Sequence, residues 1–353
     1  MKDKSNRVVR RKMLASALLL LPLLSACSQN TGTNSGASAI DPPPAEFEDT
    51  MLREAEGTEV KDGITVYLLD RNGYVAPMTL VNKPDAKSQR SAAEVAVAWM
   101  TADQQLADQL PPGFSPILPE GTKINSVKQD TDDKSITIDF AAPFPTMNPA
   151  HERKMLEALV WTMTEFPGIE KLKLTVAGKT LEKLPASGMP VGAVLTRSMG
   201  INLEHAKGVQ VNRTMGVTLY FSARSASGDG YFVPVTRLID RSPDRARAAL
   251  EQLIQGPLDT TNLQPVLTSD KVSVEQLSQL ENTVKVSLND SEWTEQKPLP
   301  ADMMEALVLT MTEVTGAPQV RLVMNGSDSL IDSDQRSYSQ PVSRPTAINA
   351  LKR

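Results

Sequence analysis

The hydrophobic and polar positions of this chain run through the same order of patterns twice. Asn72 and Gly73 stand between two alternating stretches in the first half, and Gly228 and Gly230 do so in the second. Such residues accept a positive φ, so each pair of stretches predicts a β-hairpin. The four alternating stretches are Gly63–Asp70, Tyr74–Val81, Gly216–Ala223 and Tyr231–Ile239.

The second strand of each predicted hairpin carries a proline at the matching place, Pro77 and Pro234. Proline has no backbone N–H to donate to a neighbouring strand. We therefore expect these two strands to lie at a sheet edge or to carry a bulge.

A helical pattern follows each hairpin. Ser91 and Glu94 form a capping box ahead of residues 92–110. In the second half Ser242 precedes Pro243, which we place at the first helical position, and Gly256 ends the pattern.

Each half continues with two strands, a second helix and a last strand, and then an Arg-x-x-x-Ile-Asn sequence, Arg197–Asn202 and Arg344–Asn349. Each half therefore has the order β-β-α-β-β-α-β. This order predicts the α/β fold class, in the form of an α+β two-layer sandwich. The sandwich is expected twice, as two tandem domains at 59–207 and 208–353. The six further strands are expected at Thr122–Gln129, Ser135–Ala141, Lys171–Gly178, Lys271–Leu277, Thr283–Leu288 and Gln319–Gly326.

The second helix of each half contains nearly the same nine residues, EALVWTMTE at Glu157–Glu165 and EALVLTMTE at Glu305–Glu313. The two glutamates of each copy are eight positions apart, about 12 Å by helical rise. Paired glycosidase carboxylates are only about 5 to 9.5 Å apart. We therefore expect a solvated helix face, with a partner-docking face as the alternative. The apolar stripe behind it comprises Met155, Leu159, Met163, Phe166, Met303, Leu307, Met311 and Val314.

Residues 1–26 read as a targeting segment, to be set aside from the fold. A basic start precedes the apolar run Met13–Leu24, which is shorter than the roughly 20 residues of a stable membrane span. The sequence Leu24-Ser25-Ala26-Cys27 then resembles a bacterial lipobox. The resemblance implies cleavage between Ala26 and Cys27 and acyl chains such as palmitate on Cys27. The alternative is an ordinary secretory signal with an incidental cysteine.

Charge and composition limit the choice of partners. Without residues 1–26 the net charge is about −10, so nucleic acid and an anionic membrane surface would repel the folded part. Cys27 is the only cysteine, so once it is lipidated no thiol remains for disulfides, redox chemistry or a cysteine nucleophile. Residues 27–58, rich in Ser, Gly, Asn, Thr and Pro, predict a tether with a reach of roughly 30 Å.

The side chains that carry chemistry are sparse. The two histidines, His151 and His205, lack a second ligand at helical spacing, and the acidic stretches Asp130–Asp133 and Asp328–Asp334 lack the pattern of a calcium loop. We read both stretches as solvated turns. No phosphate-binding loop or nucleophile motif occurs. The sequence therefore predicts no catalytic, metal or cofactor site, and a protein that is not an enzyme.

Binding to cell-wall polysaccharide is one candidate function for a protein without a catalytic site. Sugar-binding proteins offer exposed aromatic platforms, whereas aromatic residues make up 4% of this chain. We expect Trp99 and Trp161 to be packed inside. Trp293 is the one candidate for an exposed platform, and its other interpretation is a loop anchor.

The lipobox, the tether and two copies of a domain with ITVYL, MLEALVWTMTEFPGI and LTVAG resemble the GerM-type sporulation and germination lipoproteins, a family with tandem GerMN domains. The resemblance covers residues 1–27 and 60–350. It implies domains similar to the ring-building domains of secretion systems. It also implies a non-enzymatic assembly role in the channel between mother cell and forespore, and hence in germination competence.

The same resemblance implies a place at the outer side of the mother-cell membrane, facing the forespore. The implied partners are membrane-anchored ring proteins and further copies of the chain, with no nucleic acid and no small-molecule substrate. Two similar domains in a row can also present unlike faces head to tail, a type of contact that closes into rings.

Overall fold

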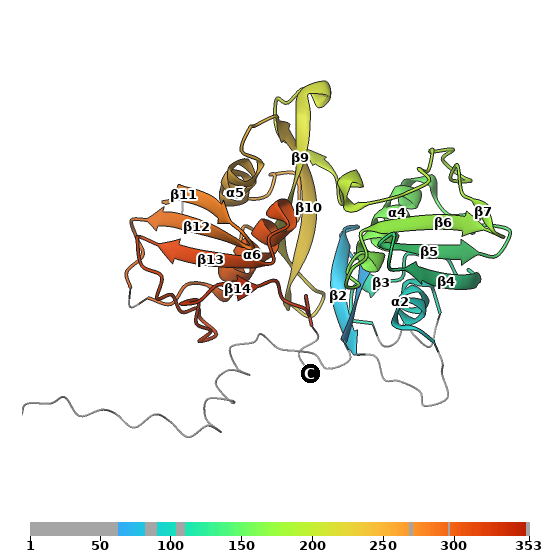
Figure 1. Ribbon diagram of the computed structural model, residues 1–353, viewed down its shortest axis with the longest axis horizontal. Coiled ribbons are helices and arrows are strands. Elements are labelled where there is room, and N and C mark those ends of the chain that lie inside the picture. Colours follow the sequence, from blue (N-terminus) through green and yellow to red (C-terminus); the bar gives the residue numbers. More distant parts are fainter. Residues whose placement is uncertain (1–62, 82–89, 104–109, 268–270, 296, 351–353) are drawn as a thin grey trace, which may run out of the picture. The chain divides into compact units, whose positions relative to one another are not determined.

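The first repeat begins with the hairpin that the alternating pattern predicts (Figure 1). Strand β1 (Gly63–Asp70) pairs antiparallel with β2 (Val75–Val81), and the short β3 (Phe114–Ser115) lies on the other side of β1. The turn is fixed by Asp70, whose Oδ1 accepts hydrogen bonds from the backbone N–H groups of Asn72 and Tyr74.

A separate four-stranded sheet completes the first repeat, in the order β4-β5-β6-β7. Strands β5 and β6 are parallel, because α4 connects them, and the other pairs are antiparallel. The elements are α2 (Ala92–Met100), β4 (Ile124–Asp130), β5 (Ser135–Phe140), α4 (Pro149–Met163), β6 (Lys171–Val176), β7 (Lys179–Thr180) and the short 3₁₀ helix η1 (Arg197–Met199).

The second repeat has the same order of long strands and helices, with the short β8 and η2 ahead of its hairpin. Its hairpin pairs β9 with β10, and its four-stranded sheet has the order β11-β12-β13-β14. The elements are β8 (Glu204–His205), η2 (Val211–Arg213), β9 (Thr214–Arg224), β10 (Gly230–Asp240), α5 (Arg245–Gln255), β11 (Val272–Leu280), β12 (Thr283–Asp290), α6 (Ala301–Thr315), β13 (Gln319–Met324) and β14 (Val342–Ser343).

This computed structural model describes residues 63–81, 90–103, 110–267, 271–295 and 297–350. The predicted targeting segment, the lipobox residues Leu24 to Cys27 and the tether lie outside the described residues. Both repeats belong to one unit, Glu46–Arg353. Of the helices in the described ranges, none has both the length and the apolar character that crossing a bilayer requires.

The predicted fold class is confirmed, with one addition: each repeat divides its strands between two sheets. Helix α4 contacts β1 and β2 of the hairpin sheet as well as β6 of the second sheet. It is therefore enclosed on two sides, and ten of its fifteen residues are buried. The predicted apolar positions Met155, Leu159 and Met163 are fully buried, and Phe166 packs at their edge.

Two helix ends differ from the predictions. The capping box of Ser91 and Glu94 is present, but α2 ends at Met100 rather than near residue 110, because the chain turns outward at Thr101 and Ala102 bonds to the backbone of Leu118. In α5 the N-cap is Asp244, which accepts a hydrogen bond from the N–H of Arg247. Pro243 therefore precedes the helix instead of opening it.

The prolines lie where a sheet edge tolerates them. Strand β2 is an edge strand, and Pro77 lies opposite Tyr67 of β1. Strand β10 contacts β8 only through Arg237 and Leu238, so Pro234 also lies on an unpaired stretch of edge. The hairpin edges of both repeats therefore carry, at equivalent places, backbone groups that no neighbouring strand pairs.

Candidate functional site

The repeated nine-residue sequence joins each second helix to its hairpin. Its first threonine is fully buried in both repeats, as Thr162 and Thr310. Thr162 Oγ1 accepts a hydrogen bond from the N–H of Tyr67 at 2.9 Å, and Thr310 Oγ1 accepts one from the N–H of Tyr220 at 3.1 Å. The repeated letters therefore fix a strand to a helix in each domain.

The end of the repeated sequence meets an arginine that comes from the Arg-x-x-x-Ile-Asn segment of the same repeat. In the first repeat Arg197 Nη2 donates to Glu165 Oε1 at 2.8 Å, and Arg197 Nε donates to Thr164 Oγ1 at 2.7 Å. Its guanidinium lies over the Trp161 ring, 4.4 Å from the ring centroid. Tyr67 Oη donates a second hydrogen bond to Glu165 Oε1, at 2.8 Å.

Arg344 occupies the equivalent place in the second repeat. Its Nη1 donates to Thr312 Oγ1 at 3.2 Å and to the carbonyl oxygen of Leu309 at 3.1 Å, and its Nη2 donates to Tyr220 Oη at 2.7 Å. The residues that surround the two arginines thus come from equivalent positions of the repeated sequence.

The two clusters meet each other. Arg197 Nη1 donates to Glu313 Oε2 of the second repeat at 2.7 Å. In the other direction, Arg344 Nη2 lies 3.8 Å from Glu165 Oε1 and 3.4 Å from Glu313 Oε2. Two guanidinium groups and two carboxylates thus form one ion-pair cluster across the junction between the repeats.

The environment of this cluster controls its ionisation. Burial disfavours the charged form of Glu165, but the charges of Arg197 and Arg344 and the hydrogen bonds from Tyr67 and Arg197 outweigh it and lower the pKa of the carboxyl. Burial raises the pKa of the Tyr220 hydroxyl to about 12. Burial and the charge of Glu165 raise the pKa of Tyr67 as well. A general acid or base needs a pKa near the working pH. Because the pKa of Glu165 is lowered, its carboxyl group does not meet this requirement and is instead the ionised member of a structural ion pair.

A second set of contacts joins the edges of the two hairpins through the asparagines that end each Arg-x-x-x-Ile-Asn segment. Asn202 accepts a hydrogen bond from the N–H of Val75, and its Nδ2 donates to the carbonyl oxygens of Val75 at 2.7 Å and Pro234 at 2.8 Å. It therefore bridges β2 of the first repeat and β10 of the second.

Asn349 makes the equivalent bridge in the opposite direction. It accepts from the N–H of Phe232 at 2.7 Å, and its Nδ2 donates to the carbonyl oxygens of Phe232 and Pro77, both at 2.8 Å. Asn202 and Asn349 have φ values of 46° and 54°, a left-handed conformation that asparagine tolerates better than most residues.

The isoleucines of the two segments complete the joint. The carbonyl oxygen of Ile201 accepts from the N–H of Thr236 at 2.8 Å, and that of Ile348 accepts from the N–H of Thr79 at 3.1 Å. The asparagine and isoleucine contacts of one repeat with the other thus have their counterparts in reverse, as in an isologous interface. Within this chain the two domains therefore meet through equivalent segments. The hydrogen bond from Tyr231 Oη to Asp70 Oδ2, at 2.7 Å, also joins the two repeats.

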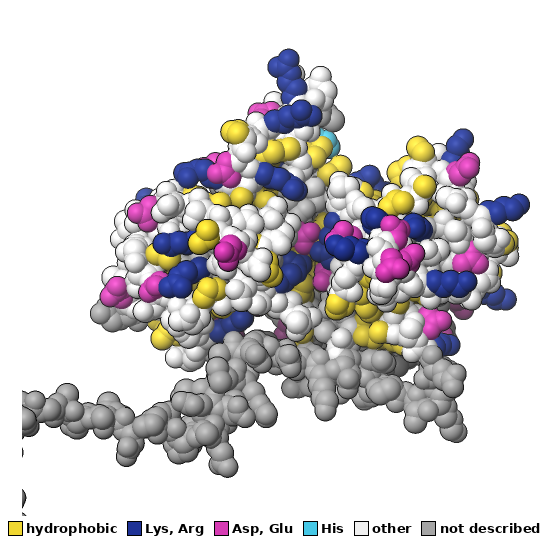
Figure 2. Space-filling model, in the orientation of Figure 1, with side chains coloured by type: hydrophobic (Ala, Val, Ile, Leu, Met, Phe, Trp, Pro, Cys, Tyr) yellow, Lys and Arg dark blue, Asp and Glu magenta, His cyan; other side chains and the backbone are white. Residues whose placement is uncertain are grey.

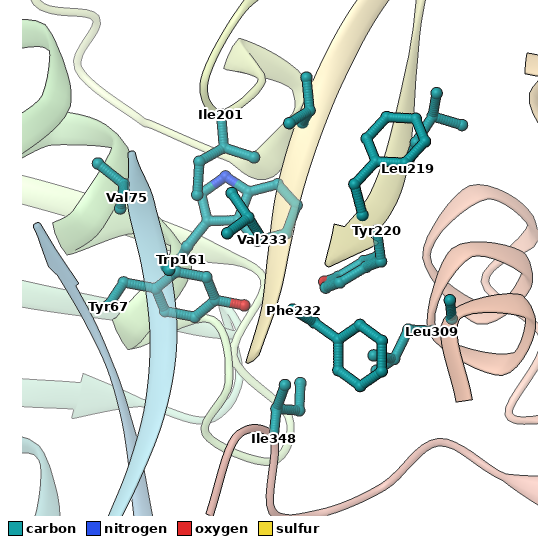
Figure 3. Packing of buried hydrophobic residues seen from close by; sticks show 14 of the residues in the cluster. Tyr67, Val75, Trp161, Ile201, Leu219, Tyr220, Phe232, Val233, Leu309 and Ile348 are labelled. Atoms are coloured by element: carbon teal, nitrogen blue, oxygen red, sulfur yellow. The ribbon is translucent and has the colours of Figure 1, made fainter. Parts of the chain in front are cut away.

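Apolar packing accompanies the hydrogen bonds (Figure 3). Ile201 and Ile348 are fully buried, as are Tyr67, Trp161 and Tyr220. Figure 3 shows the hydroxyl groups of Tyr67 and Tyr220 directed toward one another from the two repeats. The polar cluster therefore lies within a packed junction.

The predicted solvated helix face is also wrong. Glu157 is 2% exposed, and its carboxylate accepts hydrogen bonds from Arg153 Nε at 2.9 Å and from the N–H of Asn202 at 3.0 Å. The cause is the hairpin sheet, which covers the side of α4 that the amphipathic pattern assigned to solvent. Burial raises the pKa of Glu157, although Asn202 and Arg153 favour its ionised form.

The other candidate residues hold local structure. Trp293 is 7% exposed, and its Nε1 donates to the carbonyl oxygen of Lys297, so it anchors its loop and is not an exposed platform. Trp99 and Trp161 are packed inside as predicted. Asp332 is buried and accepts from the N–H groups of Asp334 and Arg336, which corrects the interpretation of Asp328–Asp334 as a wholly solvated turn.

The candidate metal ligands are dispersed. His151 and His205 are both exposed, and the described part of the chain contains no group of three or more His, Cys, Asp or Glu side chains arranged to hold a metal ion. In the Asp130–Asp133 turn, Asp133 pairs with Lys171 at 2.8 Å and Lys173 at 2.7 Å. Figure 2 shows acidic and basic side chains mixed over the face in view.

The roles of Arg197, Arg344, Asn202 and Asn349 were not predicted from the sequence. One signal for them was present: the Arg-x-x-x-Ile-Asn spacing recurs in both halves, outside any predicted helix or strand. A repeated pattern with no helical or strand period indicates side chains that are kept for specific contacts.

Comparisons with known proteins agree with this architecture. The Germane model, described as sporulation and spore germination, matches residues 65–182 and 218–329, one segment in each repeat. The chain is 30% identical over 329 residues to the spore germination protein GerM of Bacillus subtilis strain 168, covering 91% of this chain and 87% of that protein.

A solved structure of the tandem GerMN domains of the sporulation protein GerM from Bacillus subtilis is also similar. It has a TM-score of 0.74 and 31% sequence identity, and the match covers 81% of this chain and 99% of that one. The chain therefore belongs to the Germane family of sporulation and spore germination proteins and carries two tandem GerMN domains.

Proposed function

We propose that the chain is a lipid-anchored, extracytoplasmic assembly factor without catalytic activity, which supports the channel complex between mother cell and forespore. Family membership supports a role in sporulation and germination. The observation that carries the finer proposal is the reciprocal junction of the two repeats. It holds two copies of one domain in a fixed arrangement, which is what a scaffold needs to position its partners.

The membrane anchor in this proposal is Cys27, preceded by the lipobox residues Leu24, Ser25 and Ala26. Several acyl chains on Cys27 would hold the protein stably, since one chain alone gives only reversible binding. Cys27→Ala should therefore move the protein from the membrane fraction to the soluble fraction and impair sporulation. Unchanged membrane retention of this variant would contradict the anchor.

The partners in this proposal are membrane-anchored ring proteins from the two sides of the channel. The test is chemical crosslinking in sporulating cells, followed by capture through a tag after Arg353 and mass spectrometry, with Cys27→Ala as the unanchored control. Recovery of such ring proteins, lost with the control, is the expected result. Recovery of wall polysaccharide, or of the free monomer only, would overturn the proposal.

A further inference from the structure

The two repeats differ at one place where their folds are equivalent. In the first repeat a groove of about 320 Å³ separates helix α2 from the edge strand β4. Glu94 and Val97 line it from the helix, and Ile124 and Val127 line it from the strand.

The helix N-caps and the strand bulges of the two repeats identify the place in the second repeat that corresponds to this groove. Ser91 is the N-cap of α2 and Asp244 is the N-cap of α5, so Glu94 and Arg247 occupy the same helical position, three residues after the cap. The edge strands β4 and β11 each carry a bulge, immediately after Ile124 and Val274 respectively.

In the second repeat an arginine of the chain itself crosses this gap. Arg247 Nε donates to Glu251 Oε1 at 3.0 Å, and Arg247 Nη2 donates to the carbonyl oxygen of Val274 at 3.2 Å. The guanidinium thus links a helix carboxylate to the carbonyl that precedes the bulge. The first repeat has a glutamate where this arginine would be.

The carboxylate of Glu94 favours a cation in the groove. Its Oε2 accepts hydrogen bonds from the N–H and the hydroxyl of Ser91, and a carboxylate has lone pairs for further donors. The outer side of β4 also offers backbone N–H and C=O groups, as any edge strand does, and an extended chain can add to such an edge.

We propose that the groove between α2 and β4 binds an extended segment of a partner protein whose arginine enters between Glu94 and the Ile124 carbonyl, as Arg247 does within the second repeat. The extended segment lies along β4, and its arginine supplies the specificity. This inference deepens the proposed assembly function, on which it rests, by assigning the partner a place and a chemistry.

The test is titration of the ¹⁵N-labelled mature chain carrying Cys27→Ala with a capped Thr-Val-Arg-Val-Thr pentapeptide at low salt, followed by NMR. We expect shifts confined to α2 and β4, with a dissociation constant on the order of 1 mM. The same peptide with alanine in place of arginine should bind at least about tenfold more weakly, because the charge-assisted hydrogen bonds are lost.

Two reciprocal variants sharpen the test. Glu94→Arg should close the groove from within and abolish the shifts, and Arg247→Glu should open the second repeat and add shifts on α5 and β11. Glu94→Gln, which keeps the side-chain shape, is a second variant in case Glu94→Arg disturbs the capping box, and it should weaken binding. Equal affinity for the alanine peptide, shifts elsewhere, or no effect of the Glu94 variants would overturn the inference.

The inference and the proposed function can fail separately. Peptide binding at the groove, together with no captured ring proteins, would support the binding site and contradict the channel role. Equal capture of ring proteins by the Glu94→Arg chain would support the channel role and contradict the proposed binding site in the groove.

Discussion

At the scale of single residues, the duplicated ion-pair cluster is the main finding. Glu165 and Glu313 end two copies of one nine-residue sequence, and each lies within ion-pair distance of both Arg197 and Arg344. An arginine that is shared between two carboxylates couples the repeats more tightly than two separate pairs would. Removal of one charged partner leaves an uncompensated charge in a partly buried place. The resulting loss of stability is larger than the stability that the intact pair contributes.

Glu165→Gln should therefore lower the free energy of unfolding by about 2 kcal/mol at pH 7. The neutral amide accepts fewer and weaker hydrogen bonds from Tyr67 and Arg197. Urea unfolding of the mature chain carrying Cys27→Ala measures the change. The control is Glu170→Gln, whose exposed pair with Lys134 should contribute less than about 1 kcal/mol. Equal effects of the two substitutions would argue against the cluster.

The same variant should change the acid dependence of stability. Because the folded-state pKa of Glu165 is lowered, its contribution is present above the ordinary carboxyl value of about 4.3 and is lost as the pH falls through the folded value. The difference in unfolding free energy between the parent and Glu165→Gln should be constant above about pH 5.5 and shrink below 4.3. Glu157, whose pKa is raised, acts in the opposite sense and loses its contribution as the pH rises through its folded value.

At the scale of elements, the junction is made by two sheet edges and the two segments between them. Strands β2 and β10 are not paired with each other. Backbone groups along their edges form hydrogen bonds instead with Asn202 and Asn349 and with the carbonyls of Ile201 and Ile348. An open edge invites pairing with foreign strands, and the Arg-x-x-x-Ile-Asn segments occupy both edges within the chain.

Asn202→Gly should lower the free energy of unfolding by about 2 to 4 kcal/mol, because it removes three hydrogen bonds to Val75 and Pro234 while glycine still accepts the positive φ. Asn349→Gly should cost a similar amount. The control is Glu281→Gly, an exposed turn residue with φ of 49°, which should be neutral or stabilising. Thermal and urea unfolding measure these changes. An unchanged free energy of unfolding in Asn202→Gly would contradict the bridge.

Most elements follow from the sequence, because alternation and helical spacing are local signals. Strand β1 coincides with its predicted range, and the apolar stripes of α4 and α6 are buried as expected. The burial of Glu157 could not be predicted from the sequence. A helical period identifies one buried face of a helix, but it cannot show that a hairpin from the same repeat covers the opposite face. The nearly continuous apolar run from Ala158 to Trp161 was the available signal of burial on both sides.

At the scale of the whole molecule, the reciprocal junction changes what the duplication means. A head-to-tail repeat leaves one unlike face free at each end, ready to add further copies. An isologous pair instead uses the same face of both repeats and closes on itself. Further contacts of this chain therefore fall on the remaining surfaces, among them the edge strands β4 and β11, which are equivalent in fold and different in side chains.

The central claim is that the junction makes the two GerMN domains one cooperative body. Its most direct test is urea unfolding followed by ¹⁹F NMR of the mature chain carrying Cys27→Ala and labelled with 5-fluorotryptophan. Trp99 and Trp161 report on the first repeat and Trp293 on the second, all without further substitution. We predict that all three signals change with one midpoint, as in a two-state transition. Separate midpoints for Trp161 and Trp293 would contradict the account.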